Sequence, residues 1–365
     1  MTSPNQHGVP RAASLQDRSE HARARELQKI QKYQALDQLR AENDYSEDAL
    51  KKTSELLMDN AEYYSIWNYR RLILQSQLEE ISIGTDSDPA GGQSMQQLIQ
   101  EELRFLVPLL RQFPKCYWIW NHRLWVLKET IDRLPPAVAR KFWQEELALV
   151  GKMLSLDGRN FHGWGYRREI VAVLESLGAG VEVSEAEVQK HHLTEDELNY
   201  TTKMIRANLS NFSAWHNRSK LILKLLDERL AGDEERRKML DNELELIHRA
   251  LIDPYDQSLW FYHQNLMCTF DRTTAPKGMA PNMDDEERLG YLNREIDAIA
   301  ELLDEEEDCK WIYQALIECS LIVRRIQGTM SAEVKQRISD WLFNLKRLDP
   351  LRKGRWEDLE QSLMI

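Results

Sequence analysis

The sequence has few cysteines and no pattern among them. Only four occur in 365 residues, Cys116, Cys268, Cys309 and Cys319, and no two of them form a C-x-x-C pair. This scatter argues against a disulfide framework and against a zinc knuckle. We therefore expect all four cysteines to be reduced and structural.

Long apolar runs are missing as well. No stretch approaches the roughly 20 residues that a membrane-spanning helix requires, and the first residues, MTSPNQHGVPRAAS, lack the apolar core of a secretory signal. These absences predict a cytoplasmic protein with no stable membrane insertion. The nine histidines and four cysteines also show no zinc-binding spacing such as C-x2-C or H-E-x-x-H, so we expect this chain to bind no metal.

The chain has no excess of positive charge. Its formal net charge is −12, which excludes a nucleic acid or an anionic membrane as the general partner, because both attract basic surfaces. Glycine and proline are scarce, at 15 and 11 residues, whereas good helix formers are abundant. The composition predicts an all-α protein, built as one elongated domain or as two compact ones.

One spacing recurs along the chain: a tryptophan followed three residues later by a long polar side chain. The pairs are Trp67 and Arg70, Trp120 and Arg123, Trp164 and Arg167, Trp215 and Arg218, then the variants Trp260 and His263, and Trp311 and Gln314. Successive tryptophans lie 44 to 53 residues apart, which is typical of two-helix repeats with added loops. The sequence therefore predicts an array of helical hairpins, one for each tryptophan.

Two further positions define the hairpin. Seven residues before the tryptophan, five of the six copies carry Asn or Asp, which favour a helix end and a turn. Eighteen residues before it, three copies carry glutamate followed by leucine, at Glu102, Glu146 and Glu197, in segments whose apolar residues have helical spacing. Each copy is predicted to contain a first helix, a short turn, and a second helix with the tryptophan near its start.

The tryptophan and its polar partner point the same way, because residues three apart share one face of a helix. One interpretation is that each indole is buried between neighbouring hairpins, while the arginine covers apolar surface and bonds backbone carbonyls at helix ends. The other is that some of these polar residues line a concave face and contact a partner. The spacing alone leaves both open.

The sequence also gives predictions for the N-terminal end of the array and for its two acidic runs. Residues 1–19, which include His7, are polar and are expected to form a disordered tail, whereas residues 20–365 are expected to form the helical-repeat domain, beginning with an amphipathic helix over 20–39. The acidic runs at 284–287 and 304–308 are typical of solvated faces or of first helical turns. A partner-binding role for these runs stays open.

The W-x-x-R hairpin with its N-[FY]-x-x-W string resembles the repeat of protein prenyltransferase α subunits, over about residues 45–320. The strings RNFHGWGYRR (159–168), NLSNFSAWHNRS (208–219) and DPYDQSLWFYH (253–263) are most similar to the Rab geranylgeranyltransferase (type II) branch of that family. The resemblance implies a crescent-shaped right-handed superhelix of antiparallel helical hairpins. It also implies an obligate heterodimer, in which a prenyltransferase β subunit holds the zinc and most of the active site.

The activity implied by the resemblance is transfer of geranylgeranyl from geranylgeranyl diphosphate to C-terminal cysteines of Rab GTPases, with a Rab escort protein as a further partner. The α subunit of farnesyltransferase or of type I geranylgeranyltransferase is an alternative, because it shares the fold. A non-catalytic helical-repeat scaffold is a third, although such a repeat would lack both W-x-x-R and the string P-K-x-Y found here at 114–117.

One copy departs from the repeat at its turn. In FPKCYWIWNHR (113–123), Phe113 takes the helix-stop position and is followed by Pro114 and Lys115. A lysine ammonium at a helix N-terminus suits an anion, because the backbone N–H groups and the helix dipole also attract negative charge. The resemblance implies that Lys115 reaches and stabilises the isoprenoid diphosphate, and that Tyr117 lies at the subunit boundary beside the substrate.

The corresponding turn of the third copy carries Arg159, Asn160 and His162. The resemblance implies that Asn160 and His162 lie where the family faces its active site. Arg159, beside them, is a further candidate for contact with an anion. A satisfied histidine at the subunit boundary is the alternative for His162.

Overall fold

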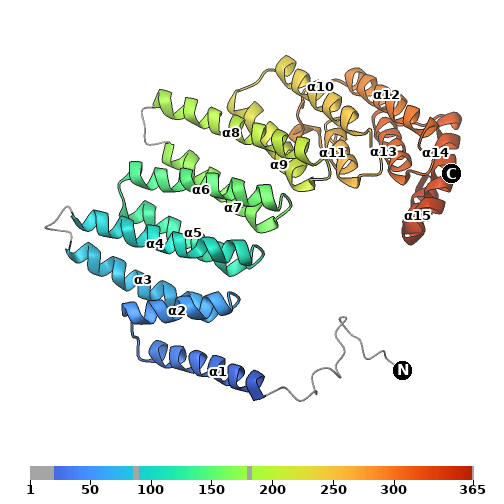
Figure 1. The fold of residues 1–365 in the computed structure, drawn as a ribbon. Coiled ribbons are helices and arrows are strands. Elements are labelled where there is room, and N and C mark those ends of the chain that lie inside the picture. The colour runs from blue at the N-terminus through green and yellow to red at the C-terminus, as the bar shows by residue number, and fades with distance from the viewer. Residues whose placement is uncertain (1–19, 85–89, 179–182, 364–365) are drawn as a thin grey trace. The chain divides into compact units, whose positions relative to one another are not determined.

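Helices account for all the regular structure in the residues that the computed structural model describes, namely 20–84, 90–178 and 183–363 (Figure 1). The prediction of an all-α protein is therefore confirmed. The predicted tail, residues 1–19 with His7, lies outside the described residues. The remainder divides into two compact units, the first reaching Met153 and including Gly165–Ile170, the second containing Leu154–Trp164 and everything from Val171 onward.

The first helices of the copies follow an opening helix, α1 (Glu20–Ala41), which covers the segment predicted to be amphipathic. They are α2 (Glu47–Asp59), α4 (Ala90–Gln112), α6 (Pro136–Leu156), α8 (Val183–Ala207), α10 (Asp233–Ala250) and α12 (Asp285–Glu301). Asp284, in one of the two acidic runs, caps α12: its carboxylate accepts from Glu287 N–H, and the Glu287 carboxylate accepts from Asp284 N–H. This run therefore begins a helix, as the sequence predicted.

The second helices are α3 (Tyr64–Gly84), α5 (Tyr117–Arg133), α7 (Phe161–Gly178), α9 (Phe212–Glu228), α11 (Gln257–Met267) and α13 (Lys310–Gln327). The first five of these begin three residues before the repeat tryptophan. Within each unit, α2 packs on α3, α4 on α5, α8 on α9, α10 on α11 and α12 on α13, which are the predicted hairpins (Figure 1).

Two helices close the chain, α14 (Ala332–Leu348) and α15 (Lys353–Leu363). Short 3-10 turns occur at η4 (Ala275–Lys277), η5 (Leu302–Asp304) and η6 (Pro350–Arg352). Helix α14 packs on both α13 and α15. Its side chains Ile338, Trp341, Leu342 and Leu345 are buried, so α14 covers the apolar end of the last hairpin.

The first five repeat tryptophans each hold the turn that precedes them in place. Their side chains are 0 to 4% exposed, and each indole Nε1–H donates to the backbone carbonyl six residues earlier. The acceptors are the carbonyls of Ala61, Pro114, Gly158, Leu209 and Pro254, at 2.6 to 2.9 Å. The indole thus fills the core with its rings and satisfies a turn carbonyl with its single donor.

The sixth copy follows the same rules in a different register from the one predicted. Helix α13 begins three residues before Tyr313, and the Tyr313 hydroxyl donates to the carbonyl of Glu307, six residues earlier, at 2.9 Å. The turn bond from Cys309 N–H to Glu306 O matches the bond from Cys116 N–H to Phe113 O in the second copy. The assignment of Trp311 and Gln314 as the sixth pair was therefore wrong, because Tyr313, two residues after Trp311, takes the position that the tryptophan has in the other copies.

A buried carboxylate joins each of three copies to the one before it. The carboxylate lies on the first helix of a copy, and it accepts from the arginine of the preceding copy and from a ring two residues after the tryptophan of its own copy. The three sets are Glu102 with Arg70 and His122, Glu146 with Arg123 and Tyr166, and Glu243 with Arg218 and Tyr262.

We call each of these sets of a carboxylate and its donors a joint. The hydrogen bonds at Glu102 show its geometry. Arg70 Nε and Nη2 donate to the two carboxylate oxygens at 2.8 and 2.6 Å, and His122 Nε2 donates to Oε1 at 2.8 Å. Burial alone would raise the pKa of Glu102, but Arg70 and His122 lower it to about 2. The arginine therefore does more than bond carbonyls at helix ends, although Arg70 Nη1 does also donate to Leu50 O.

The joint between the fifth and sixth copies uses histidine in place of arginine. Glu295 Oε2 accepts from His263 Nε2 at 3.1 Å and from His248 Nε2 at 2.9 Å. Burial would raise the pKa of Glu295, but the two histidines lower it to about 2. The hydrogen bond to Glu295 raises the pKa of His248. This joint therefore contains a histidine whose charge depends on pH.

Replacing Glu146 by Gln should lower the free energy of unfolding by about 3–5 kcal/mol, because it leaves the buried Arg123 guanidinium without its counter-charge. The adjacent Glu145 is a matched control, since its side chain is 59% exposed and Glu145→Gln should stay within about 0.5 kcal/mol. Urea unfolding of both variants measures the difference. Equal midpoints for the two variants would contradict a structural role for the joint.

The stabilisation from His248 should be larger at pH 6 than at pH 8.5. Its pKa is raised in the folded chain, so its contribution is complete below the unfolded value of about 6.5 and is lost as the pH rises through the folded value. Because the side chain is 37% exposed, the pH-dependent part should be under about 1 kcal/mol. Urea unfolding of the wild type and of His248→Gln at both pH values tests this, and a pH-independent difference would refute it.

Candidate functional site

The turn that carries Lys115 connects α4 to α5. Phe113 N–H donates to Leu109 O at 2.8 Å, and Cys116 N–H donates to Phe113 O at 3.0 Å. Trp120 Nε1 donates to Pro114 O at 2.9 Å. The turn therefore has the backbone bonds of the other copies even though it lacks their Asn or Asp, and its position is tied to a buried tryptophan.

The N-terminus of α5 has no side-chain cap. In the third and fourth copies the residue four before the tryptophan provides one: Asn160 Oδ1 accepts from Gly163 N–H, and Asn211 Oδ1 accepts from Ala214 N–H. Cys116 takes this position in the second copy, and its thiol instead donates to Ala61 O at 3.3 Å. The N-terminus of α5 thus lacks the Asn cap of those copies and directly follows the exposed Lys115, which is an arrangement suited to an anion.

Tyr117 is the first residue of α5 and is 51% exposed. Its hydroxyl accepts from Asn121 Nδ2 at 3.2 Å, and Asn121 Oδ1 accepts from Arg71 Nη2 at 2.6 Å. Burial lowers the pKa of Arg71, and its guanidinium also donates to His122 Nδ1 at 3.3 Å. The structure therefore brings Lys115, Tyr117, Asn121 and Arg71 to one end of α5.

Arg71 and Asn121 were missed from the sequence. The pattern drew attention to the residue three after the tryptophan, and Arg71 follows Trp67 by four residues. The adjacent arginines Arg70 and Arg71 were the feature of the sequence that could have revealed Arg71. Adjacent residues of a helix face different directions, so only one of the two can enter a joint and the other must lie elsewhere.

The turn of the third copy belongs to the second unit. Asn160 is 4% exposed, and as the cap of α7 it has a structural role. His162 is half-buried with its ring edge-on to Phe161, at 5.7 Å between ring centroids. Arg159 is exposed, and its charge contributes to the lowered pKa of Asp256, after the larger effects of burial, which acts in the opposite direction, and of hydrogen bonds from Ser210 and Ser258.

Aromatic side chains are exposed at the starts of second helices in both units. Tyr64, Tyr117, Phe161 and Phe212 each lie three residues before the repeat tryptophan and are 54, 51, 78 and 42% exposed. Tyr64 contacts Trp118 at 5.5 Å between ring centroids, and Phe212 contacts Phe261 at 5.9 Å. Repeated exposure of large aromatics is typical of surfaces that another protein covers.

The described part of the chain has neither a metal-binding cluster nor a membrane-spanning helix. No group of three or more His, Cys, Asp or Glu side chains there could hold a metal ion. Among the same residues, no helix has the length and apolarity needed to cross a membrane.

Comparison with known proteins identifies the repeat. The family model described as "Protein prenyltransferase alpha subunit repeat" matches residues 46–77, 99–130, 143–174 and 194–225. The chain is 33% identical to the geranylgeranyl transferase type-2 subunit alpha of Candida albicans, over 97% of each chain. The proteins of the same name from Saccharomyces cerevisiae and Schizosaccharomyces pombe are also 33% identical, over 96 and 98% of this chain.

A solved structure supports the fold. The Candida albicans protein geranylgeranyltransferase-I complexed with GGPP matches with a TM-score of 0.58, covering 90% of this chain and 87% of that one. The sequence identity in this match is 22%, so the similarity concerns the arrangement of the helices.

Proposed function

The chain belongs to the protein prenyltransferase α-subunit family, and from this premise we propose that it is the α subunit of a type 2, or Rab, geranylgeranyltransferase. The observation that supports this proposal is the similarity to relatives of that name along essentially the whole chain. This favours the type 2 enzyme over the farnesyltransferase and type I alternatives. The enzyme would transfer geranylgeranyl from its diphosphate to C-terminal cysteines of Rab GTPases presented by an escort protein, and it would act in the cytoplasm.

The chain would work as half of a heterodimer. The exposed aromatics at the starts of the second helices support a partner, since a β subunit that covered Tyr64, Tyr117, Phe161 and Phe212 would remove large apolar surfaces from water. The described residues contain no ligand set that fits zinc, so the metal would lie on the β subunit. There it would supply the thiolate form of the acceptor cysteine.

This chain's own contribution to the chemistry would come from the end of α5. The bond between the isoprenoid carbon and the diphosphate oxygen breaks during transfer, and negative charge grows on the departing diphosphate. The Lys115 ammonium and the uncapped N–H groups of α5 would stabilise that charge. Arg71 and Asn121 would hold the Tyr117 hydroxyl in place at the edge of the site.

The purified single chain should bind no stoichiometric zinc and should transfer no prenyl group, because its described residues lack a metal-ligand set. Both properties should emerge on assembly with the β subunit. Metal analysis of the single chain and of the heterodimer tests this, and one tightly held zinc on the single chain would overturn it.

Lys115→Ala, assembled with its β subunit, should bind geranylgeranyl diphosphate with modest loss and turn over about 10²-fold more slowly, since a preorganised charge acts mainly in the transition state. Lys115→Arg should keep part of the rate, because the charge survives while reach and geometry change. Lys128→Ala, at an exposed position further along α5, is the matched control.

The measurement is single-turnover transfer to a Rab–escort complex at saturating lipid. A wild-type rate in Lys115→Ala would remove this residue from the mechanism. It would leave the assignment of the chain to its family untouched, because that assignment depends on the full-length similarity.

A further inference from the structure

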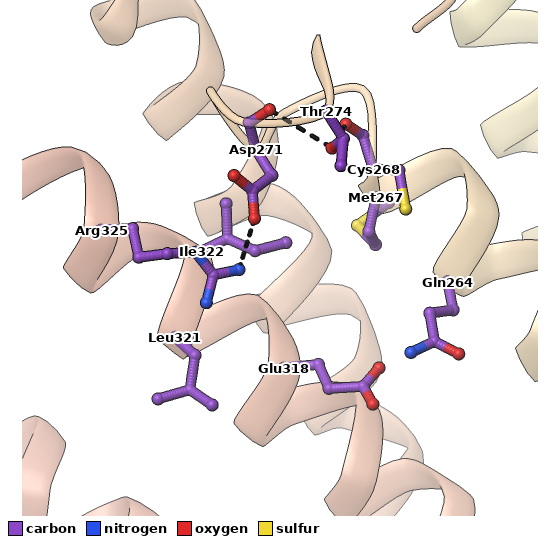
Figure 2. Close-up of a pocket in the computed structure, with 9 residues that line it drawn as sticks. All are labelled: Gln264, Met267, Cys268, Asp271, Thr274, Glu318, Leu321, Ile322 and Arg325. Atoms are coloured by element: carbon purple, nitrogen blue, oxygen red, sulfur yellow. Dashed lines mark hydrogen bonds and ion pairs between the residues drawn. The ribbon is translucent and has the colours of Figure 1, made fainter. Parts of the chain in front are cut away.

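A cavity of about 190 Å³ opens between the ends of α11 and α13, within the second unit and away from the turn of Lys115 in the chain (Figure 2). Its lining comes from α11, the loop that follows it, and α13. The lining residues are Gln264, Met267, Cys268, Asp271, Thr274, Glu318, Leu321, Ile322 and Arg325.

The two carboxylates of this cavity differ in whether a cationic side chain is bonded to them. Asp271 Oδ2 accepts from Arg325 Nη2 at 2.6 Å, so this carboxylate has its counter-charge at the rim. Glu318 accepts from the Gln314 amide at 3.0 Å, and among the described residues no Lys, Arg or His forms an ion pair with it. Figure 2 shows its carboxylate and the Gln264 amide pointing toward the same open space from α13 and α11.

Glu318 differs in this respect from the glutamates of the joints. Glu102, Glu146 and Glu243 each accept two bonds from an arginine, and Glu295 accepts from two histidines. Burial raises the pKa of Glu318, and the more distant Arg355 and His263 only partly offset this effect. A partly buried carboxylate at the wall of an open cavity, bonded to a neutral amide, is electrostatically suited to an entering cation.

The remaining lining suits the stem of a cationic side chain. Met267, Leu321 and Ile322 provide apolar wall, against which methylene groups could pack while the charged end reaches Glu318. A guanidinium could also donate to the Gln264 amide oxygen. We propose that this cavity is a binding site for a lysine or arginine side chain that a partner protein presents, with Glu318 as its counter-charge and Gln264 as a second acceptor.

Cys268 provides a built-in reporter for the test. It lines the cavity and is exposed, whereas Cys116, Cys309 and Cys319 are buried. Its tryptic peptide, residues 250–272, contains no other cysteine, so mass spectrometry can follow Cys268 in the assembled heterodimer. Methanethiosulfonates that carry a positive, a neutral or a negative group would each be reacted with it.

The positively charged reagent should react with Cys268 faster than the negatively charged one, and Glu318→Gln should reduce the ratio of the two rates by about three- to tenfold, as expected for loss of one nearby charge in a partly hydrated site. Burial raises the pKa of the Cys268 thiol most, and Asp271 and Glu318 also raise it. Glu318→Gln therefore also changes the fraction of Cys268 that is thiolate. This change affects both rates equally and cancels in their ratio. Glu333→Gln, at an exposed position on α14, is the control and should leave the ratio unchanged.

Protection identifies the ligand. N-acetyl-arginine methylamide or its lysine counterpart, at tens of millimolar, should slow the neutral reagent several-fold in the wild type and not in Glu318→Gln. The citrulline derivative, which has nearly the shape of arginine without the charge, should protect little. Which of the two cationic derivatives protects better distinguishes arginine from lysine.

The proposal would be overturned by a rate ratio unaffected by Glu318→Gln or by equal protection by the arginine and citrulline derivatives. It would also be overturned if Cys268 did not react with the neutral reagent in the heterodimer, since the cavity would then be closed. Protection by methylguanidine as strong as that by the arginine derivative would refute the side-chain ligand, because the site would then take any small cation. The test uses no prenyl transfer, so its outcome is separate from that of the proposed activity.

Discussion

The architecture depends on a buried carboxylate that must be matched by donors from two neighbouring copies at once. Glu102, Glu146 and Glu243 lie on first helices, and each accepts both from the arginine of the preceding copy and from a ring of its own copy. An ionised carboxylate in the core is very costly unless such donors meet it. Only one axial and rotational placement of a hairpin on its neighbour brings both donors to the oxygens. The joint therefore specifies packing more than it adds stability.

The repeat tryptophan and the joint both fix the position of the first turn of the second helix. In the second copy, Trp120 holds the turn through Pro114 O, and two residues later His122 anchors the same helix to Glu102. Helix α5 is therefore constrained at its first turn, which begins at Tyr117 and directly follows the turn that carries Lys115. Lys115 is therefore attached to a rigid part of the backbone, and the proposed stabilisation of a leaving group would require such preorganisation.

Departures from the repeat occur at the places where the two proposals put a role other than packing. Cys116 stands where the third and fourth copies have a capping Asn, and it forms no side-chain cap on α5. His263 replaces arginine and makes its joint sensitive to pH through the neighbouring His248. Glu318 lies at an open cavity and, within the described part of the chain, has no arginine or histidine bonded to it. A regular array makes such exceptions conspicuous, because the structural role of each position is known from the other copies.

The sequence by itself determined the helical class, the hairpin unit and the burial of the repeat tryptophans, because spacings of three, seven and eighteen residues report helix faces and turns within one copy. It also made Lys115 a candidate, since the turn of the second copy departs from the repeat, and the role of Lys115 stays a prediction. The register of the last copy was predicted wrongly. Trp311 is the residue type that the repeat predicts, but the hydroxyl of Tyr313 donates the hydrogen bond to the turn.

Two contacts between residues far apart in the chain were beyond the sequence. Arg70 meets Glu102, and Arg71 supports Tyr117 through Asn121. Only the tertiary structure decided these contacts, because which donor reaches a buried acceptor depends on the rotation of one helix against another, and a sequence spacing carries no information on that angle.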